Sequence, residues 1–259
     1  MAAQPSEPTP AQLRYGLMLA LGAAFLFSTK PIIIKWLYSL GMSALPLMSL
    51  RMLIALPVYL IVGLVMWRRL ADKPGAGDVL KAAGIGLLGY YLASYLDLSG
   101  LEYVSAQLER LMLYAYPSMV VVLGALFFGA KVGRSVIPAL ILTYAGLFVM
   151  YGHDLDVAPP GTSVSDITTG TLLVLASALS FSLYILFSKK AIARLGSLLF
   201  TSIAMGSATL ATMLHYLIEE GISVPEMDGT RWTGTLILSV FATVVPSFMV
   251  SEAISRIGP

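Results

Sequence analysis

The 259-residue sequence contains no cysteine and no asparagine, and only 12% of its residues are charged. Disulfide bonds, thiolate metal ligands and a cysteine nucleophile are therefore excluded, and there is no acceptor for N-glycosylation. Soluble domains carry about 25% charged residues, so this chain has too few charges to cover a surface that faces water. Two histidines at separate places do not form a metal site, and we expect no metal and no cofactor.

Hydrophobic residues make up 58% of the chain and fall into eight long stretches. A hydrocarbon core about 30 Å thick needs roughly 20 apolar residues per helix. The sequence therefore predicts an all-α, polytopic transmembrane bundle that follows a polar N-terminal tail over 1–13. The predicted spans are 14–37, 44–67, 78–98, 104–128, 134–152, 170–190, 197–219 and 232–253.

Basic and acidic residues alternate between successive connections. Lys and Arg gather before the first span, in the second, fourth and sixth connections and after the last span, whereas acidic residues dominate the other loops. By the positive-inside rule this predicts a plasma (inner) membrane protein with a cytoplasmic N-terminus. The charges do not form one basic patch, so we expect no nucleic-acid partner. The residues concerned are Arg14, Arg68, Arg69, Lys73, Lys81, Lys131, Arg134, Lys189, Lys190, Arg194 and Arg256, against Glu102, Asp154, Asp156, Asp166, Glu219, Glu220, Glu226 and Asp228.

The chain contains an internal repeat. Gly16–Trp36 aligns without a gap with Gly170–Lys190, and the same offset brings Leu40-Gly41 close to Leu195-Gly196. Five spans fit within one period, and an odd number inverts the second copy in the bilayer, as in many secondary transporters. We expect a first repeat over 14–152, an external linker over 153–169 and a second repeat over 170–259. The second repeat holds three of five helices, so we expect a C-terminally shortened version of a 5+5 plan.

Two segments carry a resemblance to a known family. Residues 100–106 (GLEYVSA), followed by Tyr116-Pro117 and residues 126–129 (LFFG), are similar to the fourth-helix signature of EamA-like proteins of the drug/metabolite transporter superfamily. The tail over 253–259 is similar to the start of the matching segment in the second repeat. The resemblance covers the chain from residue 14 onward. It implies ten helices, a substrate cavity between the two halves, and uptake or export of small metabolites such as amino acids.

Ionisable residues inside a span are costly and by default indicate function. The clearest cases are Lys30 in the first span, Arg51 in the second, and Glu109 and Arg110 in the fourth, and Asp97 lies near the outer end of the third. Their similar depth predicts one polar layer with a net positive charge, which favours a carboxylate or phosphate on the substrate. Ion pairs that merely hold helices together explain the same residues equally well. Glu109 is the candidate for a proton-coupling carboxylate.

Several aromatic residues complete the predicted substrate site. Tyr91 and Tyr95 share one face of the third span, Tyr114 follows Arg110 by four residues, and Tyr184 occupies the repeat position of Lys30. Such rings suit the wall of a small-molecule cavity, although packing within the bundle is an equally good explanation. The stretch Gly84–Gly89 spells G-x-G-x-x-G, but no strand precedes it, so helix packing is the better interpretation.

The favoured function is a secondary transporter that moves a small polar or anionic metabolite, with export as the expected direction, by alternating access. Its partners are a small-molecule substrate and the lipid bilayer, while proton coupling and a homodimer stay open. We expect no catalytic residues and no enzymatic activity. The alternatives are a non-transporting or degenerate membrane subunit and a membrane-embedded transferase, for which no cluster of catalytic acids or histidines is present.

Overall fold

The computed structural model of the protein describes residues 10–129, 133, 136–158, 161–223 and 225–257. Every regular element in these ranges is a helix, and eight helical segments are long and apolar enough to cross a membrane. The predicted all-α, eight-span bundle is confirmed. Most of the N-terminal tail, Lys131 and Arg134 lie outside the described residues. The helices are α1 (Pro10–Ser39), α2 (Ala44–Arg69), α3 (Ala76–Gly86), η1 (Leu87–Leu92), α4 (Ala93–Leu101), α5 (Ala106–Leu113), α6 (Tyr116–Phe128), α7 (Val136–Asp156), α8 (Val164–Leu195), α9 (Ser197–Glu219), α10 (Gly229–Ser239), η2 (Val240–Val244) and α11 (Val245–Ile257).

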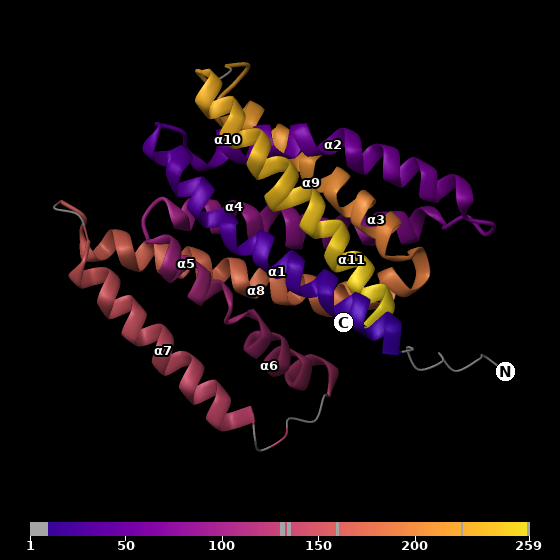
Figure 1. Cartoon of the computed structure of the whole chain (residues 1–259), viewed down its shortest axis with the longest axis horizontal. Coiled ribbons are helices and arrows are strands. Elements are labelled where there is room, and N and C mark those ends of the chain that lie inside the picture. Colours follow the sequence, from indigo (N-terminus) through magenta and orange to yellow (C-terminus); the bar gives the residue numbers. More distant parts are fainter. Residues whose placement is uncertain (1–9, 130–132, 134–135, 159–160, 224, 258–259) are drawn as a thin grey trace.

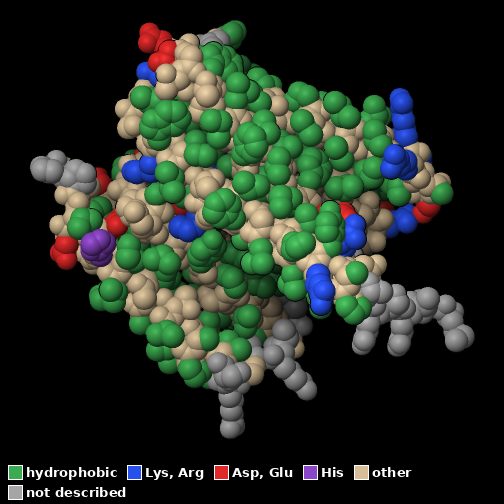
Figure 2. Space-filling view, viewed as in Figure 1, with side chains coloured by type: hydrophobic (Ala, Val, Ile, Leu, Met, Phe, Trp, Pro, Cys, Tyr) green, Lys and Arg blue, Asp and Glu red, His purple; other side chains and the backbone are tan. Residues whose placement is uncertain are grey.

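The two ends of the bundle differ in charge. Successive spans run in opposite directions, so the connections after α1, α4, α7 and α9 meet at one end, which we call the acidic end (Figure 1). The connections after α2, α6 and α8 meet at the other, which we call the basic end. Between them, hydrophobic side chains cover much of the visible surface, with most acidic groups at the left and most basic groups at the right (Figure 2). This apolar belt is the surface expected of a protein that lies in a bilayer.

The packing between helices is arranged in symmetric pairs. Helix α4, in the third span, packs on α8, and its repeat counterpart α11 packs on α1. Likewise α3 packs on α9 while α10 packs on α2, and α2 and α9, which correspond to each other, form the central contact of the bundle. In these contacts the two repeats exchange roles, as expected of two inverted copies.

A local irregularity recurs in the two repeats. The third span changes to a π-helix at Leu87 and the eighth at Val240, 153 residues later. This separation is close to the offset at which the sequence aligns with itself. One-turn π-helical segments are rare and often mark functional sites. Serines from α8 support the first segment, because Ser180 Oγ donates to the Leu88 carbonyl (2.8 Å) and Ser177 Oγ to the Ala93 carbonyl (2.7 Å).

The fourth span is broken, whereas the sequence predicted one continuous helix over 104–128. Helix α5 ends at Leu113 and α6 begins at Tyr116, with Pro117 in its first turn. Proline has no N–H to donate to the carbonyl four residues earlier, that of Leu113, and its ring clashes with that carbonyl. The break follows Glu109 and Arg110 by less than two turns. Broken helices of this kind form substrate sites in transporters.

The connection between the repeats is shorter than the predicted linker over 153–169. Helix α7 continues to Asp156, and α8 begins at Val164 behind a capping box in which Ser163 and Asp166 exchange hydrogen bonds. The cap satisfies backbone N–H groups that would otherwise lack partners at the start of the helix. Polar residues at the helix start are therefore the reason that hydropathy placed the boundary too late.

Glycines allow the helices to cross closely beside the third span. A Cβ on Gly100 would lie 2.8 Å from the Gly170 carbonyl oxygen, and one on Gly86 would lie 2.5 Å from the Ala204 backbone. A Cβ on Gly89 would meet the Tyr184 ring at 2.3 Å. The interpretation of the G-x-G-x-x-G stretch as helix packing is confirmed for two of its glycines, whereas Gly84 has no atom within 4 Å of such a Cβ.

One face of α1 breaks the symmetry. In α8, Ser182 Oγ donates to the Tyr116 carbonyl of α6 (3.0 Å), and both α5 and α6 pack on this helix. The counterpart of Ser182 is Ser28, and among the described residues no helix of the second repeat covers that face of α1. Only 17% of the most apolar window of α1 is buried, compared with 44% for α8. This face therefore borders an open groove.

Candidate functional site

The centre of the candidate site is an ion pair inside the bundle. Lys30 Nζ of α1 lies 2.6 Å from Asp97 Oδ2 of α4, and the two side chains are 12% and 4% exposed. Asp97 lies one turn before the end of α4, close to Gly100, where α4 and α8 cross closely. The sequence singled out Lys30. Its partner was recognised only as a nearby charge.

Three further charged groups surround this pair. Glu109 and Arg110 follow each other in α5, where Arg110 Nε lies 3.6 Å from Glu109 Oε2. Arg51 of α2 is 3% exposed and Glu109 is completely buried. Lys30 interacts electrostatically with the other charged groups, and Asp97 interacts with Glu109. We call Lys30, Arg51, Asp97, Glu109 and Arg110 the ionic cluster. The structure thus brings together the four charged residues that the sequence proposed for the site.

The ionic cluster has unsatisfied hydrogen-bonding groups. In the described part of the chain eight buried side-chain atoms lack a hydrogen-bond partner, and six of them belong to the cluster. They include nitrogens of both guanidinium groups, Arg51 Nε and Arg110 Nε and Nη2, and oxygens of both carboxylates. Buried polar groups are nearly always paired in native proteins. A cluster with open donors and acceptors can therefore take up a polar ligand.

A groove leads to this cluster from the side of the bundle. It has a volume of about 450 Å³, within the usual range for small-molecule sites. Helices α1, α5 and α7 form its walls, and Arg110 is its one charged lining residue. Most of the other lining groups are apolar. The complete lining is Ser28, Pro31, Ile32, Ala106, Gln107, Arg110, Leu111 and Met150.

The structure places Tyr91 and Tyr95 beside α9 rather than in the ionic cluster. The Tyr91 hydroxyl lies 3.1 Å from His215 Nδ1, and the Tyr95 ring meets the His215 ring edge-on with centroids 4.7 Å apart. Both tyrosines contact His215, as expected of residues that share one face of a helix. Tyr114 lies nearer to the cluster, with its ring centroid 5.9 Å from the Arg110 guanidinium carbon, but its side chain is largely exposed.

Tyr184 also lies away from the ionic cluster, in a group of tyrosines deeper in the bundle. Its hydroxyl donates to the Tyr90 hydroxyl (3.0 Å), which joins α8 to the π-helical segment η1. The Tyr59 hydroxyl lies 2.7 Å from Ser247 Oγ and joins α2 to α11. Sequence reasoning missed both Tyr90 and Tyr59. Position within a span was the only available signal, because partners in distant helices leave no local pattern.

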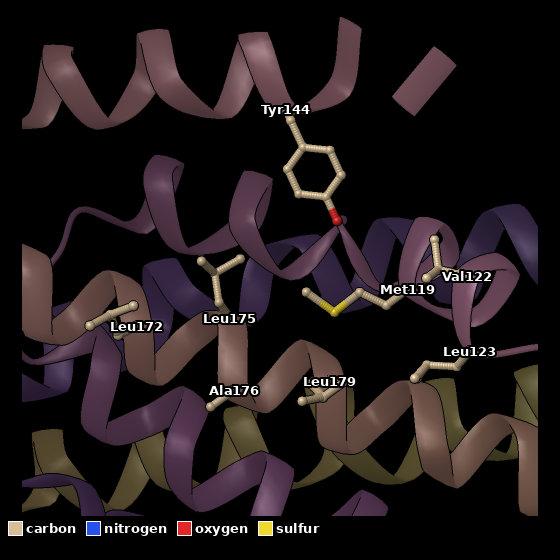
Figure 3. Close-up of a pocket in the computed structure, with 8 residues that line it drawn as sticks. All are labelled: Met119, Val122, Leu123, Tyr144, Leu172, Leu175, Ala176 and Leu179. Atoms are coloured by element: carbon tan, nitrogen blue, oxygen red, sulfur yellow. The ribbon is translucent and has the colours of Figure 1, made fainter. Parts of the chain in front are cut away.

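A second groove lies between α6, α7 and α8 (Figure 3). Its volume is about 390 Å³, and Tyr144 is its most polar lining residue. In the close-up the Tyr144 side chain extends from α7 toward Met119 of α6. The groove carries no charged group among its lining residues and therefore suits an acyl chain rather than a polar solute. Among the described residues, no group of three or more His, Cys, Asp or Glu side chains is placed to hold a metal ion.

Comparison with known proteins gives the family of the chain. Residues 14–152 and 168–259 match the sequence model of the EamA-like transporter family. The uncharacterized transporter YcbK of Bacillus subtilis (strain 168) is 27% identical over 249 residues, which cover 94% of this chain and 78% of that protein. A protein of known crystal structure shares the fold with a TM-score of 0.63 at 19% identity, over 93% of this chain and 79% of its own.

Proposed function

The chain belongs to the EamA-like transporter family, and we propose that it is a secondary transporter for a small polar or anionic metabolite. Amino acids and organic acids are the substrate classes, and export across the plasma membrane is the proposed direction. The observation that carries this proposal is the ionic cluster, because buried charges with open hydrogen-bonding groups lie beside a broken helix in a bundle of paired repeats. Charged groups inside a membrane bundle mark substrate and ion pathways.

The guanidinium groups support an anionic substrate. Both Arg51 and Arg110 have buried nitrogens without a hydrogen-bond partner among the described residues. Arginine presents a planar fork of donors that suits a carboxylate or phosphate. Glu109, whose carboxyl group lies against that of Asp97, is the residue that we propose for proton coupling.

Contacts at the two ends of the bundle support alternating access. At the acidic end, Arg231 of α10 donates from Nε and Nη2 to the Leu40 carbonyl just after α1 (3.0 and 2.6 Å). At the basic end, Arg194 of α8 lies 3.5 Å from Asp78 of α3, and 2.9 Å from Asp72. Asp78 and Arg231 occupy equivalent positions in the two repeats, 153 residues apart. The protein thus has one latch at each end, and rocking of the halves would open one at a time.

The charges of the connections support the orientation. The basic end carries the Lys and Arg residues of the even-numbered connections, which favours the cytoplasmic side for this end. The N-terminus belongs to the same end, since α1 runs from there to the acidic end (Figure 1). Substrate would then leave the cell at the acidic end, which lies within about three turns of the ionic cluster.

Counterflow in proteoliposomes tests the proposal. The purified chain is reconstituted with an unlabelled candidate inside, and uptake of the same labelled compound is followed for a panel of amino acids and organic acids. We expect transient accumulation of at least one compound above that of protein-free liposomes. Equal signals with and without protein across the whole panel would contradict a transport function for this chain.

A further inference from the structure

The formal charge of the ionic cluster is not balanced. The cluster contains three bases and two acids, so it carries a charge of +1 when both carboxylates are ionised. Lys30 is paired with Asp97 at 2.6 Å, and Arg110 has Glu109 as its neighbour at 3.6 Å. Arg51 interacts electrostatically with Asp97, but it forms no ion pair within 4 Å and its buried Nε has no hydrogen-bond partner among the described residues. The surplus positive charge is therefore associated with a side chain that is 3% exposed.

Three charged residues near the ionic cluster, Glu102, Asp154 and Lys35, are held at helix ends, and we call them the rim charges. Glu102 accepts a hydrogen bond from the Ala44 backbone N–H at the start of α2 (2.6 Å). Asp154 accepts bonds from the Ser105 backbone N–H (2.8 Å) and hydroxyl (2.7 Å) at the start of α5. Helix N-termini carry a partial positive charge, which stabilises these two carboxylates where they are.

The rim charge Lys35 is also held at a helix end. Lys35 Nζ donates to the carbonyl of Leu101, the last residue of α4 (3.0 Å). The C-terminus of a helix carries a partial negative charge, which suits an ammonium group. Each of these three charges is thus bonded to a backbone group at a helix end, whereas Arg51 has no such bond to a residue that the structure describes.

Burying an unpaired charge in an apolar environment costs free energy, and a counter-charge lowers this cost. We propose that the ionic cluster selects its substrate by charge, and that the preferred substrate carries a single negative charge that pairs with Arg51. This inference rests on the proposed transport function and specifies its substrate class as monovalent organic anions. We place the remainder of such a molecule in the groove of about 450 Å³ that Arg110 lines.

Charge balance explains why monovalent anions are preferred. A monovalent anion makes the occupied cluster neutral, which lowers the cost of enclosing it within the bundle. A divalent anion leaves one negative charge, and a neutral solute leaves the positive charge of the empty site. At distances of a few ångströms in a partly buried site, one unit charge changes the affinity by at least about tenfold.

Ligands with one skeleton and three charges test the inference. Succinate, its half-amide succinamate and its diamide succinamide carry two, one and no negative charges, and the malonate series repeats the test on a shorter skeleton. Binding is measured on the purified full chain in lipid nanodiscs, as the ligand-dependent rise in the thermal unfolding midpoint. We expect each half-amide to bind at least about tenfold more tightly than the diacid or the diamide of its series.

Two variants shift the cluster charge in opposite directions. Arg51→Gln lowers it to 0, and we expect the preference to move toward the diamide. Glu109→Gln raises it to +2, and we expect a move toward the diacid. Because the expected shifts are opposite, either variant alone gives a decisive result if the other fails to fold. Arg69→Gln, at the exposed end of α2, removes the same charge outside the cluster and should keep the parental order.

The outcomes separate this inference from the proposed function. An order of binding that is the same in the parent, Arg51→Gln and Glu109→Gln overturns charge selection, and so does a parent that does not distinguish the three ligands. If counterflow of any substrate persists in those cases, the proposed transport function stands without the inference. If the parent neither binds these ligands nor shows counterflow, both fail.

Discussion

Replacing Gly86 with alanine tests the packing that holds the third span in place. Gly86 is the last residue of α3 and faces α9, where an added Cβ would lie 2.5 Å from both the Cα and the carbonyl oxygen of Ala204. The obstructing atoms are backbone, so no side-chain rotation can relieve the contact. Ordinary carbon contacts begin near 3.4 Å, which means that α3 and α9 must separate by about 1 Å.

Overpacking of this kind destabilises a protein by about 1–3 kcal/mol. Gly84 provides a matched control, because it belongs to the same helix and no atom lies within 4 Å of its Cβ position. Alanine at Gly84 should stabilise the protein by up to about 1 kcal/mol through its higher helix propensity. The same substitution two residues apart is therefore expected to have opposite signs.

Reversible unfolding in mixed micelles, with increasing denaturing detergent, measures both effects on the free energy of unfolding. We expect Gly86→Ala to unfold at a lower detergent fraction than the parent and Gly84→Ala at an equal or higher one. Equal stability of Gly86→Ala and the parent would refute the close crossing of α3 and α9 and the arrangement of the third span built on it.

Two further predictions concern the ion pair and the basic-end latch. Lys30→Met should lower the free energy of unfolding by about 3–5 kcal/mol, because it leaves Asp97 buried without its partner. Adding Asp97→Leu should restore much of the loss. Unfolding in mixed micelles measures both variants, and additive losses would count against the pairing. Arg194→Gln should open the latch to Asp78. It should therefore raise the rate of maleimide labelling at a cysteine introduced at Ser188, a buried position near the basic end in a chain without native cysteines. Unchanged labelling would argue against a latch there.

The number of the spans and their approximate positions could be predicted from the sequence because both depend on properties that are local in the chain. A run of about 20 apolar residues has few structures open to it in a bilayer. The repeat was equally visible, and the two π-helical segments at Leu87 and Val240 have nearly the predicted separation.

The candidate site was predicted in part. Charge within a span was enough to single out Lys30, Arg51, Glu109 and Arg110, because so few residues of that kind occur there. It could not reveal that Lys30 pairs with Asp97 while Arg51 stays unpaired, since this depends on how α1, α2 and α4 are packed. The break in the fourth span depends on Pro117, which the sequence showed without indicating whether the helix would bend or stop.

The tyrosines show the same limit. Tyr184 occupies the repeat position of Lys30, yet it bonds to Tyr90 rather than to a charged group. Tyr91 and Tyr95 share a neighbour, His215, from a helix more than a hundred residues away in the chain. Equivalent positions in inverted repeats have equivalent backbone surroundings, but the side chains around them differ between the copies.

Transport should depend on the guanidinium of Arg51, which pairs with the transported anion. Counterflow of a labelled anion that the parent exchanges, measured in parallel for Arg51→Gln and Arg69→Gln, tests it most directly. We expect Arg69→Gln to exchange like the parent and Arg51→Gln to lose at least about nine-tenths of the rate, since one unit of buried charge corresponds to tenfold or more in affinity. Exchange by Arg51→Gln at the parental rate would contradict the account.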